Sequence, residues 1–283
     1  MAKGLVKKIV GGNKNVMDDV DSFNQSFDNW TEEFLETPFN EFDELANDII
    51  KGYEASNVSK FQKKTSFAPS TLVYGHGVCP RYWYLAFEGG MFENNNTGKQ
   101  IANMDSGTDR HERIQSAMEG ANVLLASEVD TRYEDPPIKC KVDCFIKWKD
   151  EEYVGEIKTK DDEGFKYYLK TRKPSSYQVL QLLIYMKIYR KKKGLMIYEN
   201  KNTHDLLILP ININQAHVDF VDYLFGWMRE VYSAWNDKKL PEIPFRGGKQ
   251  IKVCDGCPLK NTCSSSPVGD IKIPRRKDEK GAF

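Results

Sequence analysis

The 283-residue chain lacks any hydrophobic run that approaches the roughly 20 residues needed to span a bilayer. Its first residues contain no long apolar stretch, so we expect no secretory signal. The absence of a repeat period excludes a solenoid, and a total of only six cysteines excludes a small disulfide scaffold. Hydrophobic residues make up 40% of the chain and charged residues 29%, which predicts a globular protein. We therefore expect a cytoplasmic protein in a reducing compartment, without membrane association.

The chain also lacks net charge, but its charges are unevenly distributed. Residues 16–50 contain eleven acidic residues and no Lys or Arg, which leaves 41 basic and 30 acidic residues elsewhere. A basic body predicts a polyanionic partner, most simply DNA. A solvated, lysine-rich surface is the alternative for such a composition.

The acidic segment is also rich in aromatic residues. Phe23, Phe27, Trp30 and Phe34 recur at spacings of three and four, which predicts an amphipathic helix that Pro38 would interrupt. A polar stretch over 51–70 is typical of a linker, so we expect an acidic arm and linker over residues 1–65. The apolar residues of 16–50 would pack within the domain, occlude a basic cleft, or bind a protein partner.

The remainder of the chain has the pattern of an α/β domain. Predicted helices cover about 79–84, 100–119 with a break near 106–107, 175–193 and 214–237. Predicted strands cover 123–133, 138–148, 152–159, 195–200 and 205–211. This order favours one central mixed sheet flanked by helices. We expect that domain to span residues 66–268, followed by a basic C-terminal tail over 269–283.

Two carboxylates lie on either side of a predicted hairpin turn at 149–151. Asp143 comes six residues before Lys149 and Glu156 five residues after Glu151, so pairing of the strands about the turn brings them together. Two carboxylates on one sheet face favour a bound Mg²⁺ or Mn²⁺. Lys158 is placed to hold an attacking water or to stabilise charge on a phosphate. An exposed hairpin with a polar face is the alternative for so short a pattern.

Further motifs lie upstream and downstream of this carboxylate–lysine pattern. Asp143 with Glu156-Ile157-Lys158 resembles the core of the PD-(D/E)XK nuclease superfamily. Upstream, Gly107 and His111 resemble the Gly-x-x-x-His motif of its RecB-like branch. Downstream, Gln181 and Tyr185 resemble the Gln-x-x-x-Tyr motif of that branch, with both side chains on one helical face. The three motifs occur in the family's order over residues 107–185.

Two departures from the family pattern flank the first carboxylate. Val142 stands where the superfamily's name has proline, and Lys139-Cys140 stands where a glycine is common.

The resemblance implies a restriction-endonuclease-like core and a metal-dependent deoxyribonuclease. The implied Mg²⁺ or Mn²⁺ ligands are His111, Asp143, Glu156 and the Ile157 carbonyl. Catalysis would rest on Asp143, Glu156 and Lys158, with Gln181 and Tyr185 positioning Lys158 or the DNA strand. The family favours an exonuclease acting on DNA ends or single strands in DNA processing, replication or recombination. The alternative is a DNA-end-binding accessory factor with weak or partner-dependent nuclease activity.

The cysteines form a second pattern. Cys254, Cys257 and Cys263 lie close together in a Gly/Pro-rich segment, which is typical of a metal clamp in a reducing compartment. Such a clamp needs a fourth ligand, and Cys79 is the candidate because Cys140 and Cys144 have the pattern of core residues.

This cysteine arrangement resembles the iron–sulfur subgroup of RecB-like nucleases, which includes AddB-type nucleases and the nuclease of CRISPR spacer acquisition. It implies a 4Fe–4S cluster on Cys79, Cys254, Cys257 and Cys263, whereas the residues alone suit zinc equally. The clamp would join the N- and C-terminal parts of the domain by closing a loop of about 180 residues.

Basic and aromatic residues alternate between the Glu-x-Lys strand and the Gln-x-x-x-Tyr helix. Basic side chains bind phosphates and aromatic rings stack on unpaired bases. We therefore predict DNA contacts by Lys166, Arg172 and Lys173, together with Gln181 and Tyr185. A solvated loop is the alternative for this segment.

Overall fold

The computed structural model describes residues 39–56, 63–93, 96–245 and 251–277. The chain divides into two compact units, Met1–Ser56 and Asn57–Phe283, each of which is described by itself. The predicted amphipathic helix over 23–34 lies outside the described residues. The domain boundaries expected at 65 and 268 stay predictions.

The described part of the first unit is helix α2 (Phe39–Ser56). Leu45, Ile49 and Tyr53 are exposed and follow one another at four-residue spacing, so they form one apolar stripe. The helix continues through residues 51–56, where the sequence favoured a linker. The four-residue spacing of the apolar residues extends past Gly52 to Tyr53, which is a helical pattern.

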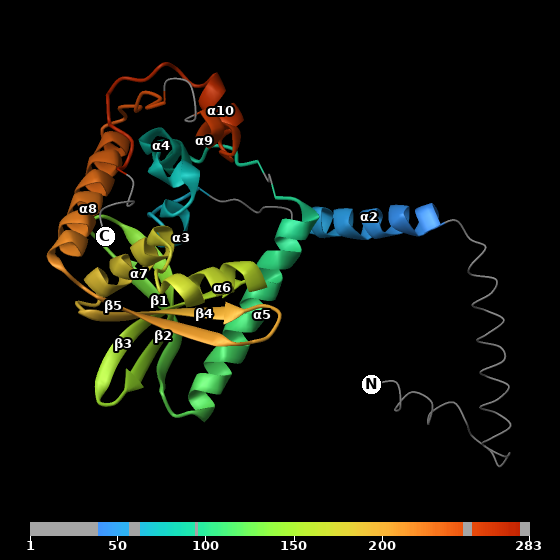
Figure 1. The fold of residues 1–283 in the computed structure, drawn as a ribbon. Coiled ribbons are helices and arrows are strands. Elements are labelled where there is room, and N and C mark those ends of the chain that lie inside the picture. Colours follow the sequence, from blue (N-terminus) through green and yellow to red (C-terminus); the bar gives the residue numbers. More distant parts are fainter. Residues whose placement is uncertain (1–38, 57–62, 94–95, 246–250, 278–283) are drawn as a thin grey trace, which may run out of the picture. The chain divides into compact units, whose positions relative to one another are not determined.

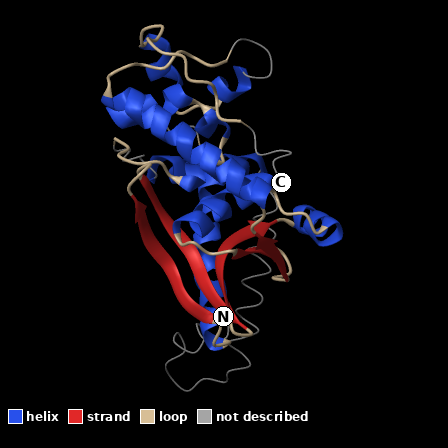
Figure 2. Ribbon diagram, turned by 90° about the vertical axis from the view of Figure 1, so that its left-hand side faces the viewer, coloured by secondary structure: helices blue, strands red, loops and turns tan. Residues whose placement is uncertain are grey.

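The second unit is built on one five-stranded mixed sheet with the order β1-β2-β3-β4-β5 (Figures 1 and 2). The strands are β1 (Leu124–Tyr133), β2 (Ile138–Trp148), β3 (Glu151–Lys160), β4 (Lys193–Asn200) and β5 (Leu206–Asn212). Neighbouring strands are antiparallel except β3 and β4, which are parallel. All five strands agree with the sequence prediction to within two residues, which confirms the α/β class with flanking helices.

The helices of this unit precede, interrupt and follow the sheet (Figure 1). They are α3 (Pro69–Leu72), the 3₁₀ turn η3 (Gly75–Val78), α4 (Pro80–Glu88), α5 (Gly98–Gly120), α6 (Asp162–Thr171), α7 (Ser176–Ile188), α8 (Gln215–Asn236), α9 (Ile251–Asp255) and α10 (Lys260–Ser265). Helices α6 and α7 form the crossover that makes the β3–β4 pair parallel.

Three helix predictions differ from the structure. The break expected near 106–107 is wrong: α5 is continuous, since Gly107 faces open space and Thr97 with Gln100 caps the start of the helix. Helix α7 ends at Ile188 rather than 193, because Arg190 adopts a left-handed conformation with φ 53°. Helix α6 occupies a segment for which the sequence predicted neither a helix nor a strand.

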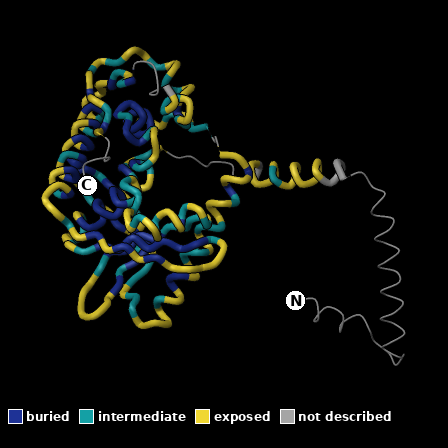
Figure 3. The backbone as a smooth tube through the Cα atoms, viewed as in Figure 1, coloured by how far each residue is buried: buried dark blue, intermediate teal, exposed yellow. Residues whose placement is uncertain are grey.

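Two clusters of buried hydrophobic residues lie against the sheet. Figure 3 shows the buried residues of the chain in dark blue. The larger cluster is formed with α4, α7 and α8, and the smaller with Ile114 of α5. Cys140 and Val142 pack with the larger cluster, whereas Cys144 packs with the smaller one. Alternation along this strand predicts Cys140 and Cys144 on one face, and the structure shows that this prediction is wrong. Strict alternation is interrupted at Asp143, opposite a residue of β1 with irregular backbone.

The C-terminal segment that was expected as a tail packs against the body. Arg276 is buried, and its backbone N–H donates to the Val78 carbonyl at 2.9 Å. The indole N–H of Trp227 donates to the Pro274 carbonyl at 2.9 Å. In the ranges given above, no helix has the length and hydropathy of a membrane span.

Candidate active site

The β2–β3 hairpin brings the two predicted carboxylates side by side. Cys144 pairs with Gly155, so the next positions along this register are Asp143 and Glu156. Asp143 Oδ2 accepts a hydrogen bond from the Ile157 backbone N–H at 2.7 Å. Asp143 is 9% exposed and Glu156 0%, which places two acidic groups in a largely water-free setting.

Lys158 forms an ion pair with Glu156 Oε1. Glu156 Oε2 is buried and has no hydrogen-bond partner in the described part of the chain. Burial, followed by the neighbouring charge of Asp143, raises the pKa of Glu156 to about 8 even though Lys158 opposes the shift. Burial also raises the pKa of Asp143, against the effects of Lys158 and His111. A cation at this point would favour the ionised carboxylates and satisfy the unpaired oxygen.

Lys158 itself remains a cation in this setting. Burial alone would lower the pKa of Lys158, but the charges of Glu156 and Asp143 and the hydrogen bond to Glu156 raise it overall. A positive charge is thus held beside the carboxylate pair.

Helix α5 supplies the predicted histidine. His111 Nδ1 lies 3.9 Å from Asp143 Oδ2. One group of His, Cys, Asp and Glu ligand atoms within the described residues has the spacing of a metal site: His111, Glu128 and Asp143, all within 4.8 Å of one another. Sequence motifs did not identify Glu128. Pairing of the predicted strands 123–133 and 138–148 would have placed it opposite Asp143.

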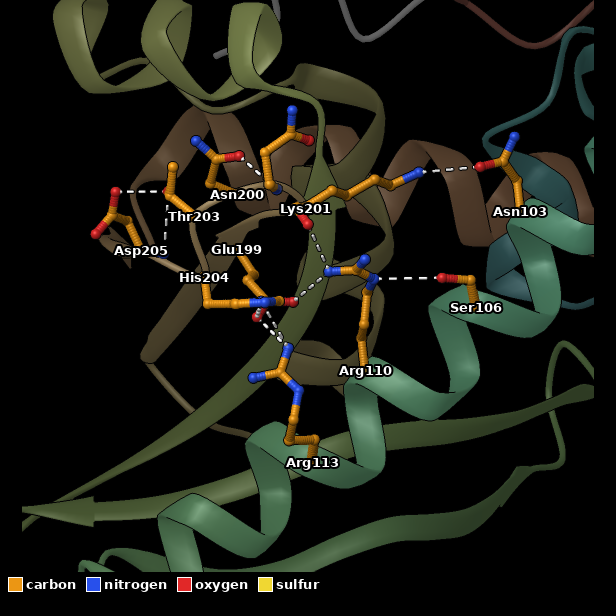
Figure 4. Close-up of polar contacts among 11 residues, drawn as sticks. Asn103, Ser106, Arg110, Arg113, Glu199, Asn200, Lys201, Thr203, His204 and Asp205 are labelled. Atoms are coloured by element: carbon orange, nitrogen blue, oxygen red, sulfur yellow. Dashed lines mark hydrogen bonds and ion pairs between the residues drawn. The ribbon is translucent and has the colours of Figure 1, made fainter. Parts of the chain in front are cut away.

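A buried carboxylate fixes α5 against the sheet (Figure 4). Glu199, at the end of β4, pairs with Arg113 and, at 3.5 Å, with Arg110; His204 Nδ1 lies 3.2 Å from Glu199 Oε1. Burial raises the pKa of Glu199, but the hydrogen bonds from Arg113, His204 and Arg110 lower it overall. Because the two arginines flank His111 in sequence, this network holds the part of α5 that carries the histidine.

The Gln-x-x-x-Tyr pair connects α7 to β2. Gln181 Nε2 donates to Tyr185 Oη at 2.7 Å, and Tyr185 Oη donates to the Lys141 carbonyl at 3.4 Å. Both side chains are buried. Burial, with the nearby charges of Glu156 and Asp143, raises the pKa of Tyr185. The pair therefore braces the strand two residues before Asp143.

The predicted DNA-contacting basic residues lie on or just after α6. Lys166 is exposed and pairs with Asp162 one turn earlier. Arg172 ends the helix in a left-handed conformation with φ 52°, and Lys173 follows it on the exposed surface. Tyr167 is 60% exposed on the same helix, which supplies an accessible aromatic ring.

A second basic surface, which the sequence reading missed, lies beside the carboxylates. A cavity of about 450 Å³ is lined by lysines from 63–64 and from β2: Lys63, Lys64, Lys139 and Lys141. Lys141 Nζ lies 3.7 Å from Glu128 Oε2, so this groove reaches the candidate metal group. Burial lowers the pKa of Lys64.

The four clamp cysteines line one cavity of about 120 Å³: Cys79, Cys254, Cys257 and Cys263. Burial, with smaller contributions from Cys257 and Cys263, raises the pKa of Cys79 to about 12. Arg81 Nε donates to Cys263 Sγ at 3.2 Å. Burial also raises the pKa of Cys257, and thiols of this kind suit a cation that displaces their protons.

No protein-family model and no curated protein matches this chain. Among solved structures it is similar to a protein designated SSO0001, with 18% identity and TM-score 0.45, covering 84% of this chain and 100% of that one. It is also similar to LHK-Exo in complex with dAMP, with 14% identity and TM-score 0.44 over 60% and 91% of the two chains. A further structure is an alkaline exonuclease (LHK-Exo) from Laribacter hongkongensis, with 11% identity and TM-score 0.42 over 66% and 95%.

Proposed function

We propose that this protein is a metal-dependent DNA nuclease of the RecB-like iron–sulfur branch of the PD-(D/E)XK superfamily. It would hydrolyse phosphodiester bonds as an exonuclease on DNA ends or single strands. The observation that carries the proposal is the buried pair Asp143 and Glu156 beside the cationic Lys158, with a Glu156 oxygen that has no partner among the residues the structure describes.

The residues that would hold Mg²⁺ or Mn²⁺ are His111, Asp143, Glu156 and the Ile157 carbonyl. A divalent cation there would polarise a phosphate oxygen and lower the pKa of an attacking water. Lys158 orients that water and stabilises negative charge that develops on the phosphate. Gln181 and Tyr185 keep β2, and with it Asp143, in position.

The lysine groove supports DNA as the substrate. Four lysines line it, Lys141 contacts Glu128 of the candidate metal group, and basic side chains bind phosphates. Lys166, Arg172 and Lys173 of the α6 region form a further predicted contact, with Tyr167 available to stack on an unpaired base.

A 4Fe–4S cluster is the proposed occupant of the four-cysteine cavity, with zinc as the alternative occupant. Four cysteines that line one cavity suit either metal. Bound there, the metal would tie α4 to the C-terminal segment and leave the carboxylates untouched. An intracellular, reducing compartment would keep these thiols free to bind it.

The arm is the proposed site of a protein partner. The exposed apolar stripe Leu45, Ile49 and Tyr53 on an acidic helix supports this role for residues 16–50 and their continuation in α2. Deletion of residues 1–56 should leave cleavage by the isolated protein unchanged. Faster cleavage at low salt would instead assign the arm to occlusion of the basic groove.

The decisive experiment incubates the purified protein with end-labelled single- and double-stranded DNA in Mg²⁺, Mn²⁺ or EDTA. We expect cleavage with either metal, none with EDTA, and none from Asp143→Asn. Asp150→Asn, which removes an exposed carboxylate in the hairpin turn, is the matched control and should cleave normally. Metal-dependent binding of DNA ends without cleavage would replace the nuclease by an accessory factor.

A further inference from the structure

Glu128 has a backbone conformation that a strand residue does not ordinarily adopt. It lies inside β1 with φ 49°, in the left-handed region that is unfavourable for residues other than glycine. Its neighbours Ser127 and Val129 pair regularly with Cys144 and Val142 of β2, so Glu128 stands opposite Asp143. Such outliers persist where the surrounding structure determines them, and they gather at functional sites.

The surrounding structure does fix this side chain. Gln115 of α5 is 6% exposed, and its Nε2 donates to Glu128 Oε1 at 2.8 Å and to the Asp143 carbonyl at 2.9 Å. Gln115 lies one helical turn after His111, so one helix face presents both side chains to Asp143. The contact between Lys141 and Glu128 Oε2 is longer, at 3.7 Å, and joins two exposed side chains, so it contributes little to holding Glu128.

The ligand atoms divide into two sets that share Asp143. His111, Glu128 and Asp143 lie within 4.8 Å of one another, and Glu156 does not belong to that group. Glu156 lies across the hairpin from Asp143, on β3. Its buried Oε2 atom has no hydrogen-bond partner among the described residues. A single ion held by His111, Asp143 and Glu156 would leave the Glu128 carboxylate with only its contacts to Gln115 and Lys141.

We propose that Glu128 is a metal ligand. It forms, with His111 and Asp143, a second position for Mg²⁺ or Mn²⁺, and Gln115 is its positioning residue. His111 then belongs to this second position, which leaves Asp143, Glu156 and the Ile157 carbonyl to hold the first ion. The inference rests on the proposed function, because Asp143 belongs to both positions. Two hard cations that share a carboxylate can clamp the attacking and leaving oxygens of one phosphodiester.

The test counts Mn²⁺ ions on the DNA-free, full-length protein by the loss of the free-ion electron paramagnetic resonance signal. Wild type is expected to bind two ions and Glu128→Gln one. The isosteric Gln keeps an oxygen that can accept from Gln115, and circular dichroism and thermal melting verify its fold. Glu134→Gln is the matched control in the exposed turn after β1 and should bind two ions. Gln115→Leu should weaken one site about tenfold, as expected for the loss of a partner that orients a ligand.

The outcomes separate this inference from the proposed function. If Glu128→Gln binds as many ions as wild type with the same affinities, the role of Glu128 as a ligand is overturned, and the carboxylate serves only as a partner of Gln115 and Lys141. Asp143→Asn should lose both ions. Undiminished binding by Asp143→Asn would overturn the metal centre itself, and with it the proposed nuclease.

Discussion

The carboxylate of Asp143 accepts a hydrogen bond from the backbone N–H of Ile157, across the hairpin, at 2.7 Å. This bond fixes the Asp143 side chain relative to the strand that carries Glu156 and Lys158. Because Ile157 packs in the smaller hydrophobic cluster, movement of its peptide would disturb the core beneath the site. The geometry of the candidate metal centre is therefore tied to the packing of the sheet.

Lys158→Met is expected to reduce the rate of DNA cleavage at least about 100-fold, because it removes the charge that would orient water and stabilise the phosphate. The variant keeps its metal ligands, so Mn²⁺ should still bind. The measurement is the single-turnover rate on end-labelled single-stranded DNA. Lys147→Met, which removes an exposed lysine of the same hairpin, should retain the wild-type rate. Equal rates for the two variants would contradict the role of Lys158.

The cysteine cavity predicts a coloured protein when purification is anaerobic. We expect iron and a broad absorption near about 400 nm. Each Ser substitution at Cys79, Cys254, Cys257 or Cys263 should lose iron and lower stability by about 3–5 kcal/mol, the scale of opening a long cross-linked loop. Metal analysis and urea unfolding check both effects.

The two remaining cysteines provide the matched controls. Cys140→Ser and Cys144→Ser lie on β2, away from the cavity, and should retain iron. One zinc ion per chain with no iron would establish a zinc clamp in place of the cluster.

The sequence predicted the features that depend on residues close together in the chain, and it missed those that depend on residues far apart. The strands and the Asp143–Glu156 pair follow from local alternation and a tight turn, so they could be predicted. The left-handed backbone of Glu128 has no local sequence signal, since neither glycine nor asparagine marks it. Likewise, the lysine groove joins residues 63–64 to β2, and this proximity is known only once the chain has folded.

Helix α6 illustrates a different failure. No helix was predicted for this segment, whose alternating basic and aromatic residues indicated DNA contacts, yet Asp161 caps its first turn by accepting from the Gly164 N–H. The capping signal was present in the sequence. The Glu199 network had no comparable signal, because its arginines come from a helix about 90 residues earlier.

His76 predicts a pH dependence of stability. Burial, with a smaller contribution from the charge of Lys64, lowers the pKa of His76 from 6.5 to about 4. The unfolded chain therefore binds a proton between these values while the folded protein does not. The stability that the neutral imidazole contributes is fully present above about pH 6.5 and is lost as the pH falls towards 4.

From this shift, about 2 kcal/mol of unfolding free energy should disappear between about pH 7.5 and 5. His76→Phe keeps an aromatic ring between Tyr74 and Tyr82 but cannot be protonated, so its stability should fall correspondingly less. Urea unfolding at the two pH values measures both proteins. A stability difference between them that is the same at both pH values would rule out His76 as the origin.

Glu199→Gln tests whether the buried carboxylate holds α5. The substitution removes the charge that Arg110 and Arg113 share, and we expect a loss of about 2 kcal/mol of unfolding free energy. Glu152→Gln is the matched control, because its pair with Lys191 is exposed to solvent and contributes little to stability. Since the two arginines flank His111, Glu199→Gln should also weaken Mn²⁺ binding, whereas Glu152→Gln should not. Equal loss of stability in both variants, with metal binding unchanged, would show that α5 is held by its hydrophobic contacts through Ile114 instead.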